Sequence, residues 1–99
     1  KLKMHHYHIL YWSAQAEVMG KRYNMTNVFD DLKAVGTTRT KQSAVSYVEM
    51  LDALCLIEIR DESNRKNLYI TEYGEKALEL EVQQKTYKLE GSAYLGGKK

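Results

Sequence analysis

Cysteine is almost absent from this 99-residue chain, its charges nearly cancel, and no long apolar run occurs in it. The single cysteine, Cys55, excludes an internal disulfide framework and a cysteine-rich zinc site. We expect it to be a buried free thiol, with a symmetric intermolecular disulfide as the alternative. No apolar run reaches the ~20 residues that a membrane-spanning helix needs, and no signal-peptide pattern opens the sequence. A cytoplasmic location is therefore expected.

Groups of residues that carry catalysis are also missing. We find no phosphate-binding glycine loop, no cluster of metal ligands and no set of nucleophile, base and acid, so we predict neither an enzyme nor a cofactor. His5 and His8 lie three residues apart, but two imidazoles without a thiolate or carboxylate are a weak metal signal. We expect them in a solvated, partly frayed amino terminus. At a dimer interface they would instead make assembly pH-sensitive.

The charge is distributed unevenly along the chain. The formal net charge is only +2, yet residues 1–48 hold seven basic and three acidic residues, whereas residues 49–90 hold six basic and ten acidic ones. A polyanion would therefore meet the first half of the chain, together with the basic pair Arg65 and Lys66. The length allows one domain, predicted over 1–90, and a flexible tail is predicted over 91–99.

Hydrophobic spacing predicts three helices in the first half of the chain. The first spans 4–19, with Tyr7, Leu10, Tyr11, Ala14 and Val18 on one apolar stripe, and Gly20 ends it. A short strand at 22–25 precedes a helix over 27–35 that Thr26 or Asn27 caps. Gly36 to Arg39 form a sharp turn, and Thr40 begins the third helix, predicted over 40–54. Four apolar residues at three-residue intervals should be its buried face: Val45, Val48, Leu51 and Leu54.

The second half predicts a hairpin and a long last helix. Strands at 56–60 and 68–70 flank a polar loop over 61–67, and Thr71 caps a helix that continues to about Leu89. Such a helix would be roughly 27 Å long, more than so small a core covers. The same helix of a second copy is the economical cover, which predicts an isologous dimer. Its interface would contain Tyr7, Tyr11, Val82, Tyr87 and Leu89.

These elements make a mainly α, α+β chain in the order of a winged helix-turn-helix. The outward side of the third helix carries Lys41, Gln42, Ser43, Ser46 and Tyr47, with no acidic residue before Glu49. That composition suits a helix inserted by its amino end into the major groove of DNA, although a merely solvated helix face uses the same residue types. The turn before the helix and the basic hairpin tip after it favour DNA.

The residues from Thr26 to about Leu80 resemble the winged-helix domains of the MarR and PadR regulator families. There "S-x-V-S-x-x-V-x-x-L" leads to a "G-L-I" entry into the wing, and "Y-x-L-T-x-x-G" ends it. The corresponding positions here are Ser43, Val45, Ser46, Val48, Leu51, Leu56, Ile57, Tyr69, Thr71 and Gly74, with one residue fewer than in these patterns between Ser46 and Val48 and between Tyr69 and Thr71. Cys55 departs from the pattern because these families usually place a left-handed glycine there. The loop GTTRT is also longer than the usual MarR turn, which favours a PadR-like or archaeal variant.

The resemblance implies a homodimeric, nucleoid-associated binder of double-stranded DNA. By position it assigns base contacts to Gln42, Ser43, Ser46 and Tyr47, and phosphate contacts to Thr38, Arg39, Thr40, Lys41, Arg65, Lys66 and Asn67. A transcriptional regulator is the first expectation. The alternatives are an architectural protein that spreads on DNA, as in plasmid partition complexes of archaea, and a winged helix that binds only protein, such as a partner in a regulatory or partition complex.

Overall fold

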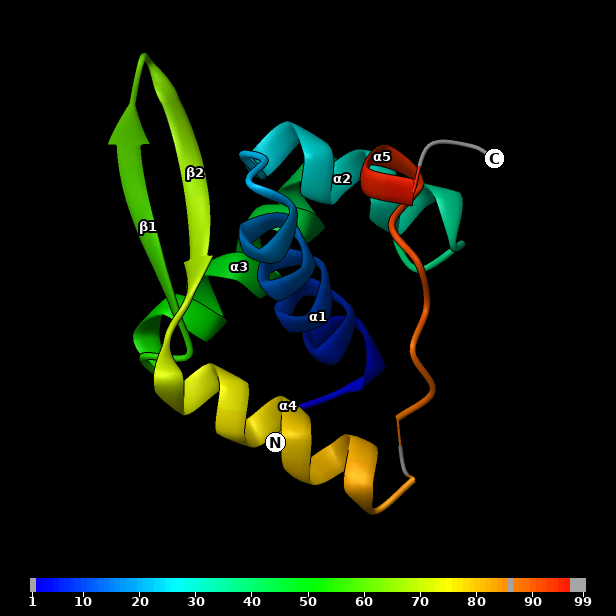
Figure 1. The fold of residues 1–99 in the computed structure, drawn as a ribbon. Helices are drawn as coiled ribbons and strands as arrows, with labels where there is room; N and C mark the ends of the chain where they lie inside the picture. The colour runs from blue at the N-terminus through cyan, green and yellow to red at the C-terminus, as the bar shows by residue number, and fades with distance from the viewer. Residues whose placement is uncertain (1, 86, 97–99) are drawn as a thin grey trace.

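The computed structural model describes residues 2–85 and 87–96, and within these ranges the chain forms five helices and one two-stranded antiparallel sheet (Figure 1). None of the helices in these ranges is long and apolar enough to cross a membrane. The α+β class predicted from the sequence is confirmed. The elements are α1 (Met4–Met19), α2 (Met25–Ala34), α3 (Lys41–Ala53), β1 (Ile57–Glu62), β2 (Arg65–Ile70), α4 (Glu72–Gln83) and α5 (Ala93–Gly96).

Helix α1 has the predicted bounds and lies at the centre of the fold, between the hairpin, α4 and the C-terminal segment (Figure 1). It is buried on more than one side, since Ile9, Leu10 and Trp12 are all fully buried. The prediction of a single apolar stripe was therefore too narrow. Its last member, Val18, was placed wrongly, because its side chain is 88% exposed.

Helix α2 begins two residues earlier than predicted. Its N-cap is Asn24, whose side chain accepts a hydrogen bond from the Asn27 amide at 3.0 Å, so neither Thr26 nor Asn27 is the cap. The strand predicted at 22–25 is reduced to one isolated bridge between Asn24 and Asn67. A helix that starts at Met25 leaves too few extended residues for a strand.

Helix α3 begins as predicted, with the Thr40 hydroxyl accepting from the Ser43 amide at 3.1 Å. Its buried face consists of Ala44, Val48 and Leu51. Val45 is half-buried, and the predictions for the carboxyl end were wrong because Leu54 is 50% exposed and Cys55 is exposed. Cys55 has φ +63°. It thus adopts the left-handed conformation that usually favours glycine at a helix end.

The hairpin is longer and its loop shorter than predicted. β1 and β2 pair from Ile57↔Ile70 to Glu62↔Arg65, so only Ser63 and Asn64 form the turn. Both turn residues have positive φ, +52° and +65°. This is the backbone of the tight type I′ turn, whose twist matches that of paired strands. Most of the predicted loop over 61–67 is therefore strand.

Helix α4 starts at its predicted cap, where the Thr71 hydroxyl accepts from the Gly74 amide at 3.1 Å. Gly74 is required for packing, since a Cβ there would overlap the Leu56 carbonyl oxygen and come within 2.9 Å of Ile70 Cγ1. The helix ends at Gln83 rather than at Leu89. Lys85 ends it with φ +60°, and the excess length that predicted a second copy is absent.

Residues 87–96 turn back across α1 and α2 (Figure 1), so residues 87–89 do not continue the last helix and residues 91–96 do not form the predicted flexible tail. We call this stretch the C-terminal strap. Its side chains Tyr87, Ser92 and Leu95 are buried against the rest of the fold, and the Trp12 indole N–H donates to the Glu90 carbonyl at 2.7 Å. The remainder of the predicted tail, 97–99, lies outside the described residues.

A buried carboxylate fastens the strap to α2. Asp31 is 1% exposed and accepts hydrogen bonds from the hydroxyls of Tyr23 and Ser92 and from the Tyr94 amide, the first at 2.6 Å and the last at 3.1 Å. Burial and the adjacent Asp31 raise the pKa of Tyr23. Because the ring hydroxyl remains protonated, it is a permanent donor to the carboxylate.

Candidate nucleic-acid interface

The amino end of α3 is an exposed polar tip. Thr40, Lys41 and Gln42 are exposed, and Ser43 is half-buried. The Thr40 hydroxyl caps the helix and also donates to the Ser43 hydroxyl at 2.9 Å. The remaining free amides of this first turn and the Lys41 ammonium give the tip a positive potential, which is the electrostatic requirement for a phosphate contact.

Two of the predicted base-contacting residues differ sharply in their surroundings. Ser46 is exposed, whereas Tyr47 is half-buried and its ring stacks on His5 with 3.9 Å between centroids. His6 contacts the edge of the same ring at 5.7 Å. Tyr47 is therefore held by α1, so its prediction as a base contact requires the ring to act from this stacked position.

The histidines of α1 are part of the packed structure, and the expectation of a frayed terminus was wrong. His6 and His8 are 4% and 5% exposed. Burial, and secondly His5, lower the pKa of His6 to about 4. His8 Nδ1 lies 2.7 Å from the Tyr87 hydroxyl, and burial lowers the pKa of His8 against the opposing effect of Glu90. No group of three or more metal-ligating side chains occurs in the described part of the chain.

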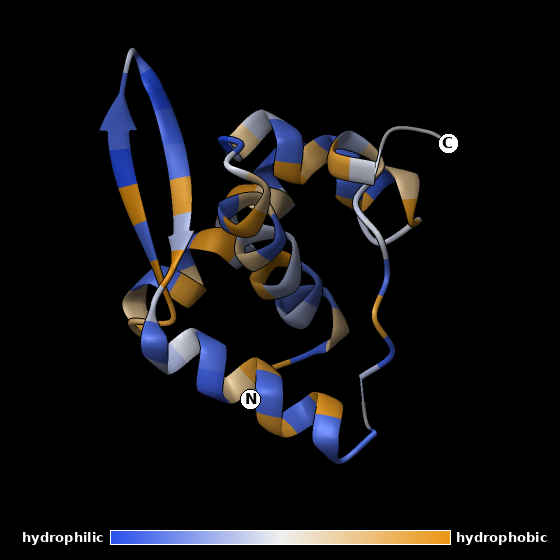
Figure 2. Ribbon diagram, in the orientation of Figure 1, coloured by the Kyte–Doolittle hydropathy of each residue, from blue (hydrophilic) through white to orange (hydrophobic). Residues whose placement is uncertain are grey.

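The hairpin tip is hydrophilic (Figure 2), but its predicted phosphate contacts are not equivalent. Arg65 is exposed, and Lys66 is exposed but bonds Asp61 at 3.1 Å. Such a surface ion pair contributes about 0–1 kcal/mol, so a phosphate can displace the carboxylate. Asn67 is 1% exposed and donates to Glu62 at 2.8 Å. Its burial contradicts the prediction that it contacts phosphate.

The turn before α3 supplies an exposed cation and a buried hydroxyl. Arg39 is exposed. Thr38, also predicted to contact phosphate, is 8% exposed, and its hydroxyl donates to the Thr40 carbonyl at 3.3 Å. Thr38 therefore shapes the entry to α3, which contradicts its assignment to a phosphate.

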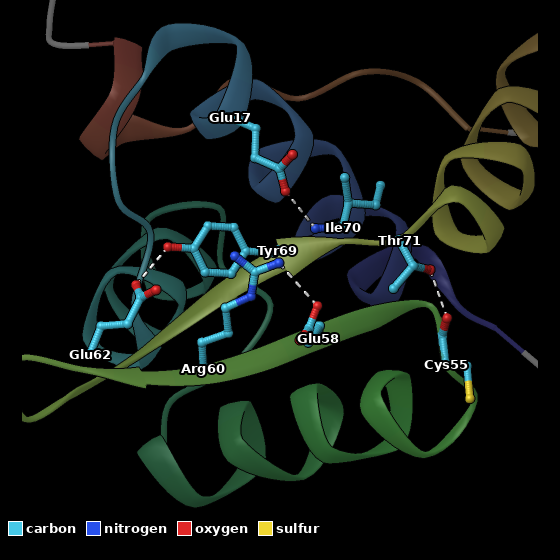
Figure 3. A network of polar contacts seen from close by, with 8 residues as sticks. All are labelled: Glu17, Cys55, Glu58, Arg60, Glu62, Tyr69, Ile70 and Thr71. Atoms are coloured by element: carbon cyan, nitrogen blue, oxygen red, sulfur yellow. Dashed lines mark hydrogen bonds and ion pairs between the residues drawn. The ribbon is translucent and has the colours of Figure 1, made fainter.

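The face of the hairpin that is turned away from α3 is a network of paired charges (Figure 3). Arg60 bonds Glu58 at 3.1 Å and lies 4.1 Å above the ring of Tyr69. The Tyr69 hydroxyl donates to Glu62 at 2.6 Å, and this bond lowers the pKa of the Glu62 carboxyl. Because cations and carboxylates alternate here, this face has little excess positive charge for a polyanion.

A cleft of about 440 Å³ separates α3 from β1. One stripe of α3 forms a wall, with residues at intervals of three or four, and Met25, Ile59 and Lys66 complete the lining. The stripe consists of Lys41, Val45, Glu49 and Asp52. Lys41 and Lys66 thus border one opening, which brings the amino end of α3 and the hairpin tip to the same side of the molecule. This cleft was not predicted from the sequence, although the spacing of the stripe is visible there.

The residues predicted for a dimer interface differ in how much of each side chain is exposed. Tyr7, Tyr11 and Val82 are half-buried within the chain, and Leu89 is 48% exposed. Tyr87 is 4% exposed and packs on α1, which contradicts its assignment to a surface. The more exposed apolar side chains of α4 are Tyr73 and Leu80, at 63% and 53%. They are seven residues apart and so lie on one helical stripe.

Comparisons with protein-family models, with curated proteins and with solved structures found no match to this chain.

Proposed function

We propose that this chain is a winged-helix protein that binds double-stranded DNA and acts as a transcriptional regulator. In this proposal α3 is the recognition helix and the hairpin β1–β2 is the wing. The observation that carries it is the shared opening bordered by Lys41 of α3 and Lys66 of β2. A helix tip and a hairpin tip on one side of a molecule can contact a groove and the adjacent backbone of the same duplex.

The proposed contacts follow exposure and charge. Gln42, Ser43 and Ser46 offer donors and acceptors to base edges, and Arg39, Thr40, Lys41, Arg65 and Lys66 offer contacts to phosphates. Thr38 and Asn67 are left out because they are buried. Four of these residues are cations, and one of them, Lys66, bonds Asp61, so one copy supplies few uncompensated positive charges.

We therefore retain a homodimer in the proposal, with half-sites about one helical turn apart. Two copies double the number of phosphate contacts and bring the affinity into a useful range. The exposed stripe formed by Tyr73 and Leu80 on α4 supports a contact between copies at that helix, in place of the interface first predicted around Tyr87.

The experiment measures duplex affinity against salt concentration by fluorescence anisotropy, with a duplex selected from genomic fragments. Each of Lys41→Ala and Arg65→Ala should reduce the slope of log K against log salt by about 1. Lys88→Ala, an exposed position on the C-terminal strap outside α3, the hairpin and the α4 stripe, is the matched control and should leave the slope unchanged. Equal slopes for all four proteins would exclude the proposed interface.

Footprinting at rising protein concentration then separates a regulator from an architectural protein. A regulator protects a bounded site, whereas a protein that spreads extends its footprint with concentration. Absence of any salt-dependent duplex binding would leave the protein-binding winged helix as the surviving alternative.

A further inference from the structure

The two edges of the hairpin differ in the hydrogen bonds that their backbone groups make. The outer edge of β2 is covered, because the Leu68 amide donates to the Tyr23 carbonyl at 2.8 Å and the Ile70 amide donates to the Glu17 carboxylate at 2.9 Å. These outward hydrogen bonds show which residues of the ladder direct their backbone N–H and C=O groups away from the partner strand. Their cross-strand neighbours on β1 are Ile59 and Ile57. The backbone N–H and C=O groups of these two residues therefore point outward on the opposite edge.

Within residues 2–85 and 87–96 no chain segment pairs with this second edge, and the backbone amides of Ile57, Ile59 and Asp61 have no hydrogen-bond partner there. An edge with free donors and acceptors is a template for another extended chain. The edge borders the cleft between β1 and α3, where Ile59 forms part of the lining.

The cleft is apolar in the middle and carries opposite charges at its two ends. Met25, Val45 and Ile59 are half-buried and provide apolar contacts in the middle. Lys41 and Lys66 stand at the end near the hairpin turn, and Glu49 and Asp52 stand further along α3. All four charged side chains are exposed. β1 also carries charged side chains, and such charges commonly prevent an edge strand from pairing with any available strand. A partner segment must therefore carry charges that match them.

We infer that this cleft binds an extended peptide segment of a partner protein, which adds to β1 as a third, antiparallel strand. Alternate side chains of the segment are apolar and contact Val45 and Ile59. Its amino end carries an acidic residue that pairs with Lys41 and Lys66, and its carboxyl end carries a basic residue that pairs with Glu49 and Asp52. The inference does not depend on DNA binding.

The test uses the whole chain, labelled with nitrogen-15, and a blocked heptapeptide of alternating valine and threonine with aspartate first and lysine last. Saturable chemical-shift changes should be largest at the amides of Ile57, Ile59 and Asp61. N-methylation of the peptide amides that face β1 should weaken binding about tenfold or more, whereas methylation of the alternate amides should change it less than about threefold. This comparison leaves the protein unchanged and so cannot be confused with misfolding.

A pair of charge variants tests the polarity. Glu49→Lys should weaken binding of this peptide about fivefold, and Glu79→Lys, which makes the same change of charge on the exposed side of α4, should not. The inference is overturned if a panel of such peptides gives no saturable shifts, if both methylated series bind equally, or if the shifts lie elsewhere. It is also overturned if sedimentation shows self-association and hydrogen exchange shows the same β1 amides protected in the associated form, since the occupant is then a second copy.

Discussion

Replacement of Asp31 should release the C-terminal strap and remove a large part of the free energy of unfolding. The carboxylate is buried and accepts from Tyr23, just before α2, and from Ser92 and Tyr94 on the C-terminal strap, so it joins two separate stretches of the chain to α2. In Asp31→Ala all three donors lose their acceptor. Two of them, the hydroxyls of Tyr23 and Ser92, belong to residues that are 1% and 2% exposed, so water cannot replace the carboxylate without local opening.

The magnitude follows from those donors. Leaving a buried donor unsatisfied costs about 1–3 kcal/mol, and the bonds lost here are to a charged acceptor. Partial opening of the strap hydrates some of them, so we expect a total loss of about 3–5 kcal/mol. A domain of this size has roughly 5–15 kcal/mol of stability. At about 4–8 °C per kcal/mol, the midpoint of thermal unfolding should fall by about 12 °C or more.

The assay is urea unfolding followed by far-ultraviolet circular dichroism and by tryptophan fluorescence. Trp12 is the chain's single tryptophan and bonds the strap through the Glu90 carbonyl, so its emission reports strap release directly. Asp30→Ala is the matched control, because this neighbouring carboxylate is exposed. A loss of less than about 1 kcal/mol in Asp31→Ala, with unchanged fluorescence, would refute the role given to the carboxylate.

Three further changes test the packing. Gly74→Ala should destabilise by about 2–4 kcal/mol in urea unfolding, because its methyl group overlaps the Leu56 carbonyl; a neutral result would mean that α4 shifts freely. Cys55→Gly should stabilise by roughly 0.5–1 kcal/mol, since φ +63° is strained for cysteine, and Cys55→Ala should not. The histidines of α1 have lowered pKa values, so the unfolded chain binds more protons than the folded one below about pH 6.5. Stability should therefore fall as the pH falls from 6.5 towards 4, and His6→Gln should flatten this dependence; an unchanged slope would contradict the burial argument.

Local signals allowed the helix starts to be predicted, because their chemistry is contained in a few residues. Thr40 and Thr71 were identified as caps, and both accept from the amide three residues later. The hairpin was predicted for the same reason, but its register was not. Ser63 and Asn64 adopt a turn with two positive φ values without the glycine that usually signals it.

The carboxyl ends of the helices and the course of the strap were less predictable. Lys85 ends α4 in a left-handed conformation, although nothing in its residue type marks a helix end. The apolar pattern continued to Leu89, so periodicity alone extended the helix. The strap depends on contacts with partners far apart in sequence, such as Tyr87 with His8 and Ser92 with Asp31, and spacing along the chain carries no information about them.

Lys41 and Lys66 belong to both proposed surfaces, which couples them. A peptide in the cleft brings a carboxylate to the same two ammonium groups that the proposed duplex would contact. Two like charges about 5 Å apart in water repel by about 1 kcal/mol, so saturation with the heptapeptide should weaken duplex binding about fivefold. By linkage, the duplex should weaken peptide binding by the same factor. Anisotropy titrations of the duplex with and without saturating peptide measure the first factor, and nitrogen-15 titrations of the peptide with and without duplex measure the second. If both ligands bind but neither affects the other, the two surfaces do not share these lysines, and the position of one of them is wrong.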